Sequence, residues 1–159
     1  MGTKSEALAR QFEAKSREAL ATLEQLGEAD WTKVTEAEKW SVGVTSHHLA
    51  SVLEPVSSMI RAVVAGQAPG NLTMALFDEM NARHAREFAD CTRAETIALH
   101  RNGSATAAAT IRGLSDAELA TSGTVLKDMP PMSAEQLIAG ALLGHIDQHY
   151  GSIRKTVGH

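Results

Sequence analysis

The sequence predicts an all-α protein, a four-helix bundle with short additional helices in its connections. Four stretches carry apolar residues at the three- and four-residue spacing of an amphipathic helix. Serine, threonine and glycine residues stand where these helices would begin and end, and no stretch alternates convincingly as a strand would. At 159 residues the chain suits a single domain, 1–159, with a core that buries roughly 70% of the unfolded surface.

The first predicted helix covers residues 5–26, where Phe12 and Leu23 belong to the apolar stripe. Gly27 is a plausible C-cap, because glycine adopts the left-handed conformation at little cost. A polar connector follows over residues 28–39.

The second predicted helix has Ser41 as its N-cap and runs to about residue 65. Pro55 lies inside it and cannot donate a backbone hydrogen bond, so we expect a kink or a local break there. Gly66 ends the helix, and residues 67–71 form a turn cluster.

The third helical region extends from its cap at Thr73 to about Gly113, and 102–104 is the expected place for a bend. A short helical turn follows at 114–119, with Ser115 and Glu118 spaced as a capping box, and 121–132 is a loop.

Ser133 opens the last predicted helix, whose apolar stripe includes His145 and His149. Gly140 and Gly144 are four residues apart, which would let another backbone approach closely. The connections are longer than in a minimal bundle and leave room for crossovers.

Composition narrows the classes of function. A formal net charge of -4 gives no reason to expect nucleic acid or an anionic membrane as partner. Cys91 is the only cysteine, which fits a reducing cytosol, and the polar N-terminal sequence has no apolar core of a signal peptide. We expect a cytoplasmic protein whose partner is a small-molecule substrate.

Two histidines near the C-terminus carry the strongest chemical signal. On a helix, His145 and His149 would project side by side, one turn apart. Two imidazoles can coordinate a divalent metal ion, but a stable site usually needs three or four ligands. The candidates are His47 and His48, which lie about 100° apart on their helix, so at most one can face the pair. The apolar periodicity prefers His48 only weakly, and a lone helical histidine is more often a packing residue.

The pattern argues against a zinc peptidase. Ile146 stands where the helical zinc-protease motif has its glutamate base. Asp147 would point about 200° away from His145. Three neutral imidazoles without a carboxylate would not neutralise the charge of the ion and would leave coordination positions open for a further ligand. This favours Lewis-acid chemistry or activation of a bound water or thiol.

Two motifs resemble the DinB-like superfamily of bacterial four-helix bundles. Trp40-Ser41 is followed, eight residues after the tryptophan, by His48-Leu49, which resembles the start of that family's second helix. The spacing of His145 and His149, with Gly151 and Ile153 after them, is similar to its final-helix motif. The resemblance implies a DinB-like bundle in which His48, His145 and His149 bind a divalent metal, often nickel or zinc.

The resemblance also implies several activities. Members of the superfamily include S-transferases that use bacillithiol or mycothiol, a mycothiol-dependent maleylpyruvate isomerase, and proteins described as metal-dependent hydrolases; dimers are common. The hypothesis for this chain is a metal-dependent enzyme that activates a low-molecular-weight thiol for S-transfer to an electrophile, as a homodimer. The alternatives are hydrolysis by a metal-activated water, and a non-catalytic stress-related binding protein with a structural metal.

The sequence assigns no catalytic or thiol-binding residue. The larger isomerase architecture is not expected in a chain this short. His84 and His100 match no ligand of the family, although His84 remains a candidate for lining a pocket.

Overall fold

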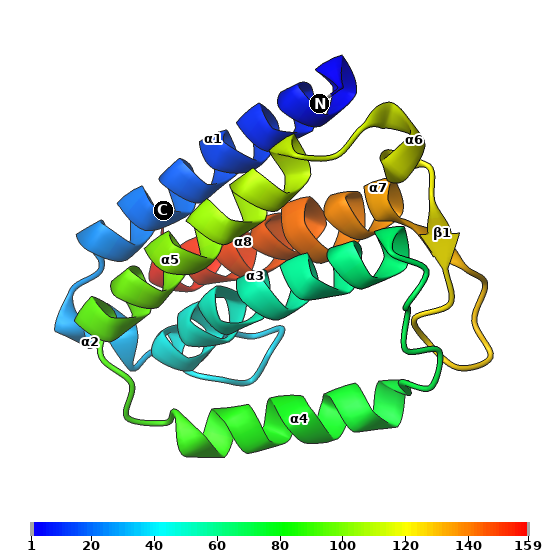
Figure 1. Ribbon diagram of the computed structural model, residues 1–159. Helices are drawn as coiled ribbons and strands as arrows, with labels where there is room; N and C mark the ends of the chain where they lie inside the picture. The colour runs from blue at the N-terminus through cyan, green and yellow to red at the C-terminus, as the bar shows by residue number, and fades with distance from the viewer. Residues whose placement is uncertain (1, 159) are drawn as a thin grey trace.

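Long helices lying side by side form the body of the protein (Figure 1). The structure is a computed structural model and describes residues 2–158. The bundle consists of α1 (Thr3–Gln25), α3 (Val42–Val64), α5 (Arg93–Arg112) and a C-terminal segment made of α7 (Ala134–Leu137), the π-helix η1 (Ile138–Gly144) and α8 (His145–Val157). The all-α prediction is therefore confirmed.

A continuous apolar core joins these segments. It contains fully buried side chains from each of them, including Phe12, Leu53, Ile111, Leu142 and Ile153. Burying one such side chain stabilises the fold by roughly 1.5–3 kcal/mol, so the core fixes how the helices sit against one another. No described helix is both long and apolar enough to cross a membrane.

The first connection differs from the prediction at Gly27. Helix α1 ends with Leu26 as its C-cap in an extended conformation, and Gly27 instead precedes a one-turn helix, α2 (Glu28–Trp31). Gly27 has a φ of -84°, so its freedom to adopt positive φ is not used. The chain then returns towards α3 through a bridge between Val34 and Ser41.

Helix α3 begins and ends close to where the sequence predicts. The side chain of Ser41 accepts a hydrogen bond from the backbone N–H of Val44 at 3.0 Å. Of the kink or local break expected at Pro55, the break is wrong, because α3 runs unbroken across this residue. Gly66, with a φ of +74°, follows the helix and turns the chain.

The third predicted helix is two helices, α4 (Met74–Glu87) and α5. The chain breaks at 88–92, and Thr92 starts α5 with a capping box completed by Glu95. The bend expected at 102–104 is wrong. Gly103 lies inside α5, and a Cβ added there would stand 2.9 Å from the Cβ of Leu53 on α3. The glycine therefore serves a close approach of two helices.

Helix α4 lies outside the bundle (Figure 1). All its residues are described, none of them is buried, and it packs along α3. Its cap, Thr73, accepts a hydrogen bond from the N–H of Leu76, as the sequence predicts.

The segment between α5 and α7 contains a short helix and two very short strands that pair with each other. Helix α6 (Asp116–Leu119) has the predicted capping box of Ser115 and Glu118. Within the predicted loop, β1 (Ser122–Gly123) pairs antiparallel with β2 (Met132–Ser133). Two-residue strands are too short to leave an alternating pattern in the sequence.

The last predicted helix also begins at its predicted cap, Ser133, which accepts a hydrogen bond from the N–H of Gln136. The close approach expected at Gly140 and Gly144 is wrong. A Cβ at Gly140 would meet nothing within 4 Å, and one at Gly144 would meet only the carbonyl oxygen of Ala139 in the same helical segment. Both glycines instead belong to the π-helical stretch.

Candidate metal centre

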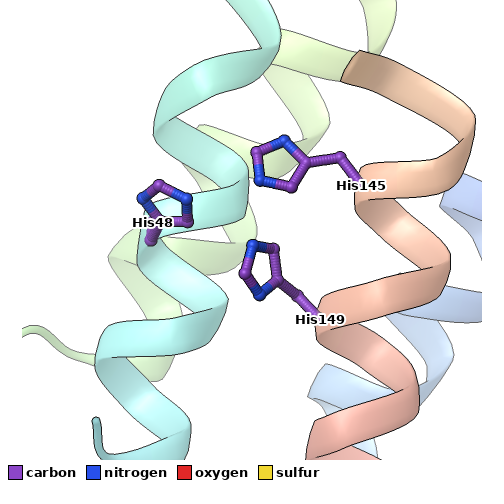
Figure 2. Close-up of side chains that lie close together, drawn as sticks. All are labelled: His48, His145 and His149. Carbon is purple, nitrogen blue, oxygen red and sulfur yellow. The ribbon is translucent and has the colours of Figure 1, made fainter. Parts of the chain in front are cut away.

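Three histidines from two distant parts of the chain meet between α3 and α8 (Figure 2). Each of His48, His145 and His149 offers a ring nitrogen, and these nitrogens all lie within 4.8 Å of one another. The ring centroid of His48 lies 5.4 Å from that of His145 and 5.1 Å from that of His149. The structure therefore brings together the three residues that the sequence singled out.

Local structure sets the position of each ring. The cap at Ser41 fixes the start of α3, and His48 follows seven residues later, about two turns along the helix. The π-helix η1 ends at Gly144, directly before His145. A π-turn shifts the side chains that follow it relative to a regular α-helix, and such turns are frequent at functional sites.

Burial keeps His48 and His145 neutral at pH 7. His48 and His149 are each only 5% exposed. Burial, together with the neighbouring imidazoles, lowers the pKa of His48 to about 3. Burial and the proximity of His149 lower the pKa of His145 to about 4. A neutral imidazole has a free lone pair, which is the form that binds a metal ion.

Glu38 orients His149 from outside the cluster. The Nδ1 of His149 lies 2.9 Å from Oε1 of Glu38, and Ser152 donates a hydrogen bond to Oε2 at 2.7 Å. Burial alone would raise the pKa of Glu38, but hydrogen bonds from Ser152, Thr35 and His149 outweigh it and lower that pKa. Because an ionised carboxylate only accepts hydrogen bonds, Nδ1 of His149 is the donor in this pair, and Nε2 is the ring nitrogen left for a metal ion.

Sequence reasoning missed Glu38. It falls in the stretch described above only as a polar connector, beside Lys39, whose φ of +62° turns the backbone. The contact joins residues 111 positions apart, and no local pattern signals it. Trp40 was used only as the start of a motif, and its contact with the site was not predicted: its ring centroid lies 5.2 Å from that of His48.

The other histidines on these helices do not belong to the three-histidine cluster. His47 lies 2.8 Å from His84 between ring nitrogens and stacks on Phe88, so it faces α4 and not the cluster. Of these two neighbours it is therefore His48 that faces the cluster, as the apolar periodicity weakly predicted. His100 lies in the bundle interior, where its Nε2 is 3.0 Å from the hydroxyl of Ser16. Asp147 is paired with Lys15 at 2.7 Å and is not part of the cluster.

An apolar cavity of about 460 Å³ adjoins the cluster between α3, α4 and the start of the C-terminal helices. His48 and His145 form part of its wall, and so does His84, as anticipated for that residue. The His84 ring centroid is 5.7 Å from that of His48. Burial and the neighbouring His47 lower the pKa of His84 to about 4, so this wall is also uncharged at pH 7.

The residues present fit a divalent metal ion. Three imidazoles from two helices resemble the donor set of sites that keep a position open for a further ligand. The hydrogen bond between His149 and Glu38 is the outer contact that usually fixes a metal-binding histidine. The cavity beside His48 and His145 leaves room for a reactant next to them.

The fold and the cluster define a helical bundle with a histidine site compatible with metal binding. Residues 12–143 match the family model described as the mycothiol maleylpyruvate isomerase N-terminal domain, and the chain belongs to this family. The family is DinB-like, which confirms the resemblance seen in the sequence. The matched segment contains His48 and ends two residues before His145. Among curated proteins, none matches the chain.

Proposed function

We propose that this protein is a metal-dependent enzyme that transfers a low-molecular-weight thiol to an electrophile. The observation that carries the proposal is the convergence of His48, His145 and His149, with their nitrogens within 4.8 Å of one another, at the edge of an apolar cavity. The description of the family names mycothiol, a thiol, which supports the choice of co-substrate. Nickel or zinc is the proposed ion, and the proposed assembly is a homodimer.

Each part of the site has a role in this proposal. His48, His145 and His149 hold the ion, and Glu38 keeps His149 in the tautomer that presents Nε2. A divalent ion held there would lower the pKa of a coordinated thiol and so supply a nucleophile at neutral pH. The cavity beside His48 receives the electrophile.

The reaction balances without an oxidant or a reductant. The thiol gives up its proton to solvent, and its sulfur forms the new bond to the electrophilic carbon. With a displaceable group, that group departs with the electron pair of the broken bond. With an activated double bond, the neighbouring carbon takes up a proton instead.

Elemental analysis tests the first step. Protein purified without an affinity tag or chelator should carry close to one equivalent of nickel, zinc or another divalent ion per chain. His48→Ala and His149→Ala should lose it. His47→Ala is the matched control, because His47 is the neighbour of His48 in sequence but faces His84, and it should keep the metal. A wild-type protein that stays metal-free after incubation with these ions contradicts the proposal.

Activity tests the second step. Metal-loaded protein is mixed with a low-molecular-weight thiol and a panel of alkylating and unsaturated electrophiles, beside His48→Ala. Thiol-dependent conjugation above that variant's background supports S-transfer. Turnover of ester or amide substrates without added thiol would point instead to hydrolysis.

A further inference from the structure

The cavity beside the histidines has a wall without charged side chains. None of its lining residues, all of which lie within the described part of the chain, is Asp, Glu, Lys or Arg. Helix α3 contributes Val52, Val56 and Met59, and α4 contributes Phe77 and Met80. Away from the histidines, a carboxylate or ammonium placed against this wall would lose hydration without gaining a charged partner, at a cost of several kcal/mol.

The cavity is long, and its imidazoles gather at one end. Along α3 its wall extends from His48 to Met59, a rise of about 16 Å at 1.5 Å per residue. The rings of His84 and His145 lie 5.7 and 5.4 Å from that of His48, so these three imidazoles lie together. The opposite end, near Met59, is apolar.

One side of the cavity is formed by a weakly held helix. Met80 lines the cavity and is nevertheless 49% exposed, so α4 covers this side only partly. Because α4 has no buried residue, its side chains can be exchanged with little effect on the core. The residues of α4 are therefore well placed to select the ligand and are suitable for testing it.

We propose that this cavity binds the uncharged, elongated apolar body of the electrophile, with the reactive carbon at the His48 end. The inference rests on the proposed function and narrows it: the part of the electrophile that lies against this wall is an uncharged aryl or alkyl group. A volume of about 460 Å³ lies in the range of pockets that bind small organic ligands.

Two probes of matched shape test the ligand class. 4-Phenyl-1-butanol and 4-phenylbutanoate differ at one end, which is a hydroxyl in the first and a carboxylate in the second. Binding of each, without thiol, is measured by titration calorimetry at pH 7.5 on the protein as purified and after its metal has been removed with a chelator. The metal-free protein decides the comparison, because an ion held by His48 and His145 would coordinate the carboxylate. The alcohol should bind roughly tenfold or more tightly than the carboxylate, because the carboxylate must be desolvated. Equal affinities, tighter binding of the carboxylate, or no binding of the alcohol overturns the inference.

Variants on two elements show whether binding occurs in this cavity. Phe77→Ala should weaken binding of the alcohol by about tenfold, which is within the range seen when apolar contacts are removed from a pocket. Leu76→Ala is the control, because Leu76 precedes Phe77 on α4 but does not line the cavity. Ala141→Leu should fill part of the cavity and also weaken binding. If Phe77→Ala and Ala141→Leu bind like the wild type, the cavity is not the binding site and the inference is wrong.

The metal content of the same protein batch separates this inference from the function it rests on. If the protein holds no metal but binds the alcohol more tightly than the carboxylate, and Phe77→Ala weakens that binding, the inferred ligand class stands and the proposed metal chemistry is contradicted. If the protein holds metal as purified but binds both probes equally once the metal is removed, the proposed metal chemistry stands and the inferred ligand class is wrong.

Discussion

Glu38 and His149 form a buried hydrogen-bonded pair across 111 residues of chain, with 2.9 Å between Oε1 and Nδ1. Both side chains are 6% exposed. The second carboxylate oxygen of Glu38 accepts from Ser152, one turn after His149 on α8. The connection before α3 is thereby anchored to the helix that carries two of the three clustered histidines.

Glu38→Gln should lower metal affinity by about 10- to 100-fold, the usual cost of losing an outer contact to a ligand. The amide keeps the size of the side chain but removes the charge that holds the proton on Nδ1 of His149. Affinity is measured by competition with a chromophoric chelator. Glu36→Gln is the control, since Glu36 is 77% exposed and pairs with Lys155 at the surface. Equal affinity in wild type and Glu38→Gln would show that the carboxylate does not tune the site.

Removing the metal should lower the melting temperature. A ligand that binds only the folded state stabilises it by about 2.7 kcal/mol at a hundred times its dissociation constant. For a chain of this size that corresponds to roughly 5–10 °C. Thermal melts of the nickel- or zinc-loaded protein with and without chelator measure the shift. His145→Ala, with one fewer imidazole in the cluster, should melt at the same temperature in both conditions. A shift of equal size in that variant would place the bound ion elsewhere.

His100 should make the fold sensitive to acid. It is fully buried, and burial lowers its pKa to about 4, whereas in the unfolded chain its pKa is about 6.5. Above pH 6.5 both states are neutral at this residue and its titration has no effect on stability. Between pH 6.5 and 4 only the unfolded chain binds the proton, so the free energy of unfolding falls as pH falls, by up to about 1.4 kcal/mol per pH unit.

Urea unfolding at pH 7, 6 and 5 checks this expectation. His100→Gln removes the titration and should show a shallower loss of stability across that range. Ser104→Ala is the control: its hydroxyl lies 2.6 Å from that of Ser16, which also contacts His100, and it does not titrate. That variant should lose the same stability at every pH. An unchanged slope in His100→Gln would mean that other groups account for the acid sensitivity.

Features set by neighbouring residues could be predicted from the sequence. Ser41, Thr73, Ser115 and Ser133 each cap the helix that was assigned to them, because the cap joins a side chain to a backbone N–H three residues on. The break at 88–92 had a similar signal in Thr92 and Glu95, spaced as a capping box. It was missed because apolar residues continue at helical spacing on both sides of it.

Features set by contacts between distant segments could not be predicted in this way. Nothing near Glu38 in sequence indicates that α8 lies beside it, and a π-turn such as η1 has no sequence signature that we could use. The choice between His47 and His48 needed the position of α4, since His84 on that helix pairs with His47. Histidine spacing on one helix indicated the pair His145 and His149, whereas the third member, His48, could be named only through its resemblance to a family motif.

Two glycines in helical segments should respond in opposite directions to the same substitution. At Gly140 an added Cβ would meet nothing within 4 Å, and the backbone does not need positive φ. Gly140→Ala should therefore stabilise the fold by about 0.5–1 kcal/mol, because alanine has the higher helix propensity and restricts the unfolded chain.

At Gly103 the added Cβ would lie 2.9 Å from the Cβ of Leu53 and 3.4 Å from the carbonyl oxygen of Ala50. Neither atom is the free end of a flexible side chain, so α3 and α5 must separate, and Gly103→Ala should cost roughly 1–3 kcal/mol. Urea unfolding of the two variants beside wild type measures both changes, and each serves as the control for the other. Stabilisation by both would mean that α3 and α5 are further apart than the structure places them, whereas destabilisation by both would mean that the π-helical stretch depends on its glycine.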